Sequence, residues 1–184
     1  AGEDFYFVQK LVPSGGYFSL NSTAVYPSAR ASDRVPFGTG AAIGKMVKGE
    51  DKLFMTYNPQ AFKDLYQFFE INEELFRSDT GQLAKLFNDF PESLKEFLEE
   101  QEWASRVTEI KNNTSGYTSF RKRFFEWFNM FKVVKFLNYS HKSIFVKVPA
   151  STAAEELLLF MNIHPPAPTK PGLLKYYRDM EKGN

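Results

Sequence analysis

The fold class is decided by residues 119–138, which read SFRKRFFEWFNMFKVVKFLN. Apolar residues recur there every three or four positions, the spacing that places side chains on one face of an α-helix. The same spacing returns in most of the chain after residue 58, so the sequence predicts a mainly α protein whose longest helix spans 119–138. The apolar face of that helix is formed by Phe120, Phe124, Trp127, Phe128, Phe131, Val134 and Leu137.

Helices are predicted on both sides of this segment. Asn58 followed by Pro59 is a favoured cap and first position, and a helix is expected from there to about residue 76. Either Ser78 or Asp79 caps the next helix. Another begins at Pro91 and carries Leu94, Phe97 and Leu98, and the apolar spacing allows it to continue to Ile110. The remaining expected helices are 3–12, a short one from Gly38 to Val47, one capped by Ser151, and 171–182; short strands are expected within 17–27 and 53–57, with a third at 144–146.

Composition narrows the class of protein. The chain has 184 residues, enough for one substantial core or for one large and one small lobe. Its net charge is +1, which gives no overall attraction to nucleic acid, and nucleic acid is not an expected partner. The absence of cysteine excludes disulfides, thiol catalysis and Cys-ligated zinc. With 20 Phe and 9 Tyr, the chain is expected to bury rings between helices or to stack them on a ligand.

Two carboxylates open the first predicted helix. Residues 2–11 read GEDFYFVQKL, so Glu3 and Asp4 lie in the first turn, where the helix dipole favours their ionised form. Phe5, Val8 and Leu11 share one face of the same helix. A carboxylate in this position is suited to act as a base, although acidic residues are also common in a first turn for stability alone.

A second segment joins the first in resembling a known family. Residues 25–40 read VYPSARASDRVPFGTG, and the two segments, in this order and spacing, resemble the family 2 glycosyltransferases, inverting GT-A enzymes that use nucleotide-activated sugars. The resemblance, to a bacterial branch of that family, covers about the first quarter of the chain. It implies that Asp4 is the catalytic base and that Glu3 orients or binds the acceptor.

The resemblance also implies what this chain lacks. A GT-A enzyme binds its nucleotide-sugar in an α/β half with parallel strands and an Asp-x-Asp motif, and no Asp-x-Asp occurs here. The chain is therefore expected to be the helical carboxy-terminal segment of a truncated α/β GT-A enzyme, with 1–57 ending the catalytic domain and 58–184 forming a helical region. Mg²⁺ or Mn²⁺ is expected in the intact enzyme, together with a nucleotide-sugar and a glycan or lipid-linked acceptor. No metal ligand is expected in this chain, and no activity is expected from it alone.

The loop before Gly40 is a candidate anion site. Backbone amides at Gly38, Thr39 and Gly40 open a short helix and are suited to a phosphate. Arg30 and Arg34 are candidates for charge-assisted contacts with substrate, and Asp33 lies between them. The alternative is a glycine-rich turn in which Asp33 and Arg34 pair with each other. The pattern is not a P-loop, because the Gly-Lys-Ser/Thr ending is absent.

The longest predicted helix carries cations next to its aromatic face. Arg121, Lys122 and Arg123 suggest docking on an anionic membrane surface, while the core spacing of the rings favours an ordinary buried helix with a wet cationic face. Membrane docking belongs to the second interpretation of the chain, a self-contained helical module that binds a protein partner or a membrane. A homodimer fits both interpretations.

Localisation and the histidines complete the expectations. The first residues lack a signal-peptide pattern, and charges interrupt every apolar stretch, so a cytoplasmic protein is expected, with peripheral membrane association as the alternative. His141 and His164 are far apart in sequence and fit no metal-ligand spacing. Each is expected in a loop or at the surface.

Overall fold

The prediction of a mainly α protein is confirmed. The computed structural model describes residues 3–12, 15, 18, 20, 22–23, 25–26, 40, 43–44, 47–48, 54–164 and 169–182, and only the backbone of 3–5. Within these residues it contains ten helices and two short strands. In chain order they are α1 (Glu3–Leu11), β1 (Met55–Thr56), α3 (Pro59–Glu70), α4 (Asn72–Arg77), α5 (Thr80–Asn88), α6 (Glu92–Glu100), α7 (Trp103–Asn112), α8 (Tyr117–Trp127), α9 (Met130–Ser143), β2 (Val148–Pro149), α10 (Ala150–Phe160) and α11 (Lys170–Glu181).

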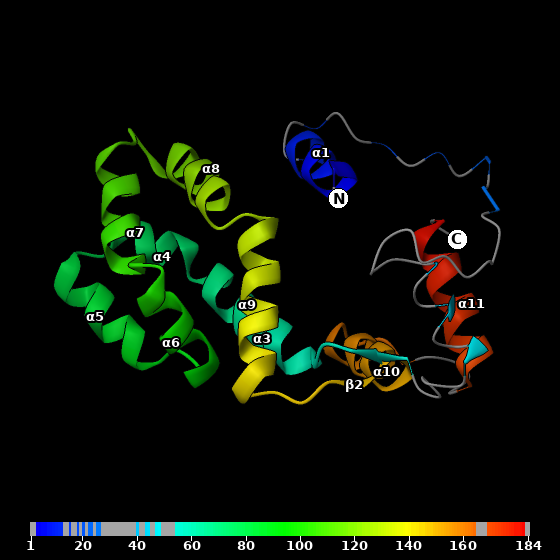
Figure 1. Ribbon diagram of the computed structural model, residues 1–184. Coiled ribbons are helices and arrows are strands. Elements are labelled where there is room, and N and C mark those ends of the chain that lie inside the picture. Colours follow the sequence, from blue (N-terminus) through cyan, green and yellow to red (C-terminus); the bar gives the residue numbers. More distant parts are fainter. Residues whose placement is uncertain are drawn as a thin grey trace. The chain divides into compact units, whose positions relative to one another are not determined.

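The chain packs as two compact units. The first unit combines Ala1–Gln9 with Tyr57–Lys147, and the second combines Lys10–Thr56 with Val148–Asn184. Figure 1 colours helices α3 to α9 of the first unit from cyan through green to yellow, and α10 and α11 of the second unit in orange and red. The predicted division into 1–57 and 58–184 follows function and not packing, and it stays a prediction.

Aromatic rings build the core of the first unit. Phe68 on α3 is fully buried, and its ring centroid lies 5.5 to 6.4 Å from five other rings. Rings at these separations attract one another beyond the area that they bury. Aromatic residues at helical spacing therefore pack α3, α7 and α8 together in one core. The five rings are Phe69, Phe90, Trp103, Phe124 and Phe128.

The prediction of one helix over 119–138 is wrong, because the segment contains a break. Helix α8 ends at Trp127, and Phe128 leaves helical geometry with φ −91° and ψ 62°. The Asn129 side chain then caps α9, where its Oδ1 accepts hydrogen bonds from the N–H groups of Phe131 at 3.0 Å and Lys132 at 3.3 Å. Such a cap satisfies amides that the first turn of a helix leaves unpaired. The apolar spacing continues through the break, and the pattern alone therefore does not reveal it.

Two other predicted helices are also divided. The segment from Pro59 to about 76 is interrupted at Ile71, between α3 and α4. The segment from Pro91 to Ile110 is interrupted at Gln101 and Glu102, where Glu102 has φ 49° in the left-handed region. Each break redirects the chain, so that two short helices contribute to the core in place of one long helix.

The caps that the sequence predicts are largely confirmed. Asn58 Oδ1 accepts from the Gln60 N–H at 2.9 Å, with Pro59 at the start of α3. Asp79 and Gln82 form a reciprocal capping box at the start of α5. The predicted cap at Ser151 is wrong, since α10 begins one residue earlier, after Pro149.

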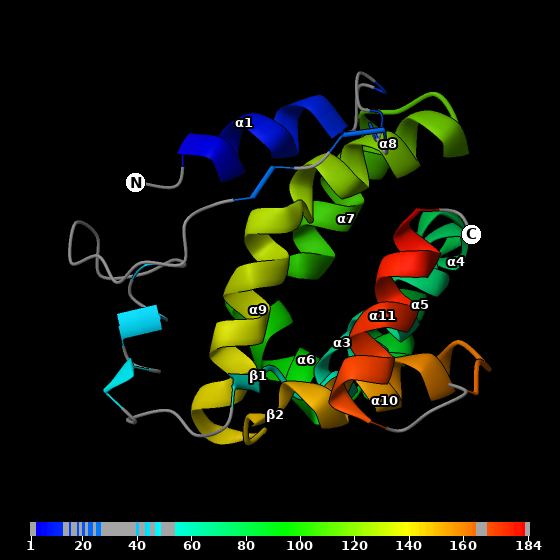
Figure 2. The same ribbon diagram turned by 90° about the vertical axis from the view of Figure 1, so that its right-hand side faces the viewer.

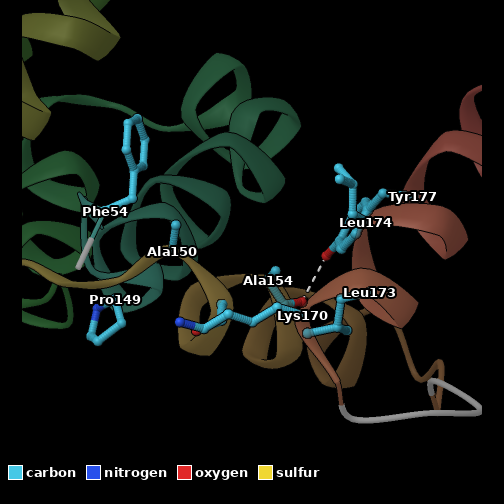
Figure 3. A pocket seen from close by; sticks show the side chains of 9 residues that line it. Phe54, Pro149, Ala150, Ala154, Lys170, Leu173, Leu174 and Tyr177 are labelled. Atoms are coloured by element: carbon cyan, nitrogen blue, oxygen red, sulfur yellow. Dashed lines mark hydrogen bonds between the residues drawn. The ribbon is translucent and has the colours of Figure 1, made fainter. Parts of the chain in front are cut away.

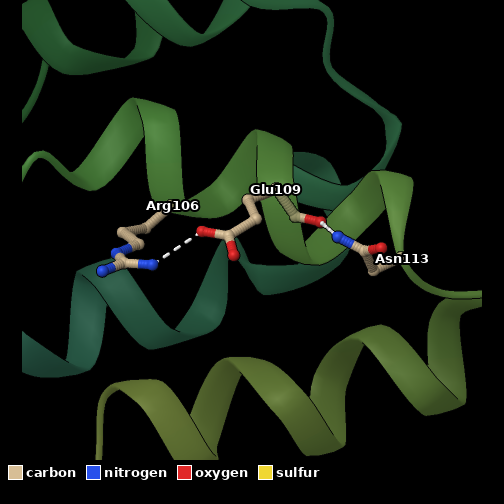
Figure 4. Close-up of polar contacts among 3 residues, drawn as sticks. All are labelled: Arg106, Glu109 and Asn113. Carbon is tan, nitrogen blue, oxygen red and sulfur yellow. Dashed lines mark hydrogen bonds and ion pairs between the residues drawn. The ribbon is translucent and has the colours of Figure 1, made fainter.

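Helix α7 ends at Asn112, and the next residue caps it. The Asn113 side-chain amide donates to the Glu109 carbonyl oxygen at 2.8 Å, and it satisfies one of the last acceptors of the helix. Glu109 also pairs through its carboxylate with Arg106, at 2.7 Å (Figure 4). Both side chains of this ion pair are about half exposed, so its contribution to stability is small.

The strands agree with the sequence in part. Met55–Thr56 lies in the expected extended segment at 53–57 and pairs antiparallel with Val148–Pro149. The strand predicted at 144–146 is wrong, because Ile144 caps α9 and pairing starts only at Val148. The described residues within 17–27 contain no strand. Val25 there is 88% exposed, and no neighbouring strand pairs with this segment in the described part of the chain.

Helices α10 and α11 form the described body of the second unit. Leu158 on α10 and Leu173 on α11 are buried. Tyr177 on α11 donates its hydroxyl to the Ala154 carbonyl oxygen at 2.7 Å. Helix α11 rises steeply from α10 and does not lie along it, in Figure 1 and in Figure 2. This steep crossing leaves space between the two helices.

Candidate functional site

The acidic pair lies where the sequence predicts it. Helix α1 begins at Glu3, which places Glu3 and Asp4 in its first turn, and the helix is nine residues long. Its positive end therefore stands beside both residues. Their side chains lie outside the described residues, and their catalytic roles remain predictions.

Helix α1 exposes apolar side chains. The side chain of Phe7 is 64% exposed, Val8 is about half exposed, and Leu11 is 38% exposed. Tyr6 places its ring centroid 6.2 Å from that of Phe131 on α9, yet Tyr6 is also about half exposed. The described part of α1 thus has no buried residue.

The candidate anion loop is described only at its end. Arg30, Asp33, Arg34, Gly38 and Thr39 lie outside the described residues. Gly40 is helical and half-buried. The described residues that follow are also helical at 43, 44 and 47, and Lys48 donates its N–H to the Gly44 carbonyl oxygen at 3.1 Å. The expected helix after the loop is consistent with this backbone, and the phosphate cradle remains a prediction.

The cationic helix α8 uses its rings in the core. Phe120 and Phe124 are fully buried, whereas Arg121, Lys122 and Arg123 are exposed. An interfacial helix inserts its aromatic side chains into the lipid headgroup region. In α8 the rings on the core face are buried inside the protein. They are therefore not available to insert into a membrane beside the exposed cations.

Lys132 on α9 is held against neighbouring side chains. Its ammonium donates to Gln101 Oε1 at 2.8 Å and lies 5.4 Å from the centre of the Trp127 ring. Burial lowers the pKa of Lys132, and the nearby charges of Lys135 and Arg106 lower it further. Lys132 therefore links α9 to the turn between α6 and α7 and has a structural role.

The prediction that His141 is a loop or surface residue is wrong. His141 lies in α9 and is half-buried. Its Nε2 accepts from the Asn58 N–H at 2.7 Å, and its Nδ1 lies 2.7 Å from the Leu137 carbonyl oxygen, which accepts the ring proton. The imidazole therefore ties the end of α9 to the start of α3. No motif in the sequence indicates this role, because Asn58 and His141 are far apart along the chain.

A pocket of about 350 Å³ lies in the second unit, between α11 and the start of α10. Figure 3 shows the Tyr177 hydroxyl bonded to the α10 backbone, and the Lys170 side chain extending along the pocket toward Ala150. Burial raises the pKa of Tyr177. Sequence reasoning missed this pocket, since it arises from the crossing of two helices. It is lined by Phe54, Pro149, Ala150, Ser151, Ala154, Lys170, Leu173, Leu174 and Tyr177.

A second hollow, of about 590 Å³, lies in the first unit beside α4 and α5. Its wall mixes acidic residues such as Glu70 and Glu74 with the cations Arg77 and Lys85. Among the described residues, no group of three or more His, Cys, Asp or Glu side chains is arranged to hold a metal ion. Nor does any described helix combine the length and apolar character needed to cross a membrane.

Comparison with known proteins adds no relative to these observations. A scan of protein-family models, a search of curated proteins and a search of solved structures each find no match to this chain.

Proposed function

We propose that this chain is the carboxy-terminal part of a family 2, GT-A type inverting glycosyltransferase. The intact enzyme would transfer a sugar from a nucleotide-sugar to a hydroxyl of a glycan or a lipid-linked glycan. The observation that carries the proposal is the position of Glu3 and Asp4 in the first turn of α1. This is the arrangement that the resemblance of residues 2–11 implies.

The surface of α1 supports the same proposal. A helix that holds a catalytic base must be fixed by packing, because small displacements of a catalytic group are costly. Phe7, Val8 and Leu11 expose apolar side chains on α1, and such residues are suited to pack against a further part of the enzyme. We assign that role to the donor-binding half.

The chemistry assigned to this chain is a single proton transfer. In the proposal the Asp4 carboxylate takes the proton of the acceptor hydroxyl while that oxygen attacks the anomeric carbon. The bond between the anomeric carbon and the nucleotide diphosphate breaks in the same step, with inversion at that carbon. Glu3 orients the acceptor. One carboxylate suffices here, in contrast to the pair that glycoside hydrolysis requires.

The metal is assigned to the donor-binding half. In the proposal no step in this chain is routed through Mg²⁺ or Mn²⁺. When bound to the intact enzyme, the ion neutralises the charge of the leaving diphosphate.

The test is an Asp4→Asn substitution in the intact transferase. Loss of the base should lower the transfer rate by about 10²- to 10⁴-fold, since the amide cannot accept the proton. Lys10→Gln in the last turn of α1 is the matched control and should leave the rate within about twofold. A rate for Asp4→Asn that equals that of the control would contradict the assignment.

The isolated chain gives a complementary test. Mixed with UDP-, GDP- and dTDP-sugars and manganese, it should show no turnover and no tight nucleotide binding. Turnover by the chain alone would contradict the proposal that the donor site lies in another half.

The alternative, a self-contained helical module, gains no specific support from α8. Phe120 and Phe124 are buried, and every exposed residue of that helix is polar or charged. An anionic-liposome assay with charge reversal at Arg121, Lys122 and Arg123 distinguishes the two: no binding, or binding indifferent to the reversal, favours the transferase.

A further inference from the structure

The pocket between α10 and α11 has apolar walls. Ala150 and Ala154 form its α10 side, and Leu173 and Leu174 form its α11 side. A volume of about 350 Å³ lies within the range of small-molecule sites. Since a water molecule occupies about 30 Å³ in the liquid, a chain of roughly ten groups of similar size fills such a space.

The polar groups of the pocket differ in whether they are free to bind a ligand. The Tyr177 hydroxyl is already committed to the Ala154 carbonyl oxygen at 2.7 Å. Lys170 is exposed, and no ion pair or hydrogen bond in the described part of the chain engages its ammonium. No acidic residue lines the pocket. The pocket thus combines apolar walls with one available positive charge.

We propose that this pocket binds a single-chain amphiphile, with its hydrocarbon chain between α10 and α11 and its anionic head on Lys170. The apolar walls provide most of the binding free energy, because they remove hydrocarbon from water. Lys170 provides the preference for an anion over a neutral or a cationic head. This inference does not depend on the proposed transferase function, since every residue used lies in the second unit.

Three probes that share one chain length test the proposal. Sodium decanoate, decanol and decyltrimethylammonium are titrated into the full chain below their micelle concentrations, with calorimetry and with NMR of the leucine methyl groups. Decanoate should bind saturably at one site, about fivefold tighter than decanol, because a partly exposed charge pair contributes modestly. Decyltrimethylammonium should bind more weakly than decanol.

Charge variants locate the head. Lys170→Gln should make decanoate and decanol equal in affinity. Lys175→Gln is the matched control: it removes a cation from the same helix, but Lys175 is exposed and paired with Asp179. It should leave the fivefold preference intact. Equal losses in both variants would overturn the role of Lys170.

Wall variants locate the chain. Ala154→Phe places a ring in the pocket and should weaken all three probes about tenfold or more. Leu174→Gln serves as a second wall variant because Leu174 is about half exposed, so its replacement spares the fold. Methyl shifts of Leu173 and Leu174 on titration support the site. An absence of saturable binding, shifts confined to the first unit, or tighter binding of the cationic probe would overturn it.

Discussion

The body formed by α3 to α9 and the pair formed by α10 and α11 bury very different amounts of apolar surface. Among the described residues, sixteen apolar side chains form the buried core of the first unit. Among the described residues of the second unit, the buried apolar side chains are Leu158 and Leu173. The first unit therefore has a core of its own, whereas the second exposes apolar residues, at Leu157 and Leu174 among others.

This difference separates structural parts from parts available for binding. A protein side chain that lies in a dense core is committed to stability. Apolar residues that stay exposed on α1 and beside the pocket of the second unit are available to a partner or a ligand. The proposed donor-binding half and the proposed amphiphile both use residues of the second kind.

The strongest test of the comparison removes the ring at the centre of the first core. Phe68→Ala should lower the free energy of unfolding of the first unit by about 3–5 kcal/mol. The substitution leaves a cavity and removes the contacts of Phe68 with five rings. Both tryptophans of the chain, Trp103 and Trp127, lie in that unit. Tryptophan fluorescence during urea unfolding therefore reports this unit alone.

The matched control is Phe62→Ala on the same helix. Phe62 is 47% exposed, and its loss should cost less than about 1 kcal/mol. Equal shifts of the urea midpoint in the two variants would mean that the first unit does not depend on the core described above.

A smaller effect is expected from a polar contact inside the same core. The carboxylate of Asp64 is buried and accepts hydrogen bonds from Ser93 Oγ and from Gln60 Nε2. Ser93→Ala leaves a buried acceptor without its donor and should cost about 1–3 kcal/mol in urea unfolding. Ser115→Ala at an exposed position is the control. Equal losses of unfolding free energy in the two variants would mean that the hydrogen bond from Ser93 to Asp64 does not stabilise the core.

The break between α8 and α9 is tested by its cap. Asn129→Ala removes the acceptor for the Phe131 and Lys132 amides and should cost about 0.5–2 kcal/mol. The Asn129→Asp variant keeps an acceptor and should retain most of the stability. If Asn129→Ala were instead stabilising, a continuous helix over 119–138 would be the better description.

The smallest effect concerns the second unit at alkaline pH. Burial raises the pKa of Tyr177 above its usual value of 10.0. The folded pKa exceeds the unfolded one, so this contribution to stability is complete below pH 10 and is lost as pH rises through the folded value. Hydrogen bonds to Glu70 and Glu96 also raise the pKa values of Tyr66 and Tyr139. Absorbance titration at 295 nm should therefore show several late tyrosines, and Tyr177→Phe should remove one of them. An unchanged late amplitude in the variant would contradict the burial of Tyr177.

Much of the fold follows from local sequence signals. Asn58-Pro59 predicts one helix start, and Ser78 or Asp79 predicts the next, because capping needs only residues close together in the sequence. The breaks at Ile71, Glu102 and Asn129 do not follow, because apolar spacing passes through all three. The positions of those breaks depend on how the helices pack against one another. The apolar pattern of one helix contains no information on that packing.

The sites differ in the same way. The Glu3-Asp4 pair is a contiguous motif and is visible in the sequence. The pocket of the second unit joins Phe54, Ala154 and Lys170, which come from three separate segments. Ala154 and Lys170 meet through the crossing of α10 and α11, whereas the Phe54 carbonyl oxygen accepts from the Ala150 N–H at 2.7 Å. His141 and Asn58 likewise meet only in the folded chain.

The central claim is that α1 is the base helix of a transferase whose donor-binding half is encoded with it. The most direct measurement is the DNA sequence immediately upstream of the Ala1 codon in the source gene. The account predicts an in-frame continuation that encodes several apolar strands and an Asp-x-Asp motif. A start codon at or just before Ala1, with no such frame, would contradict it.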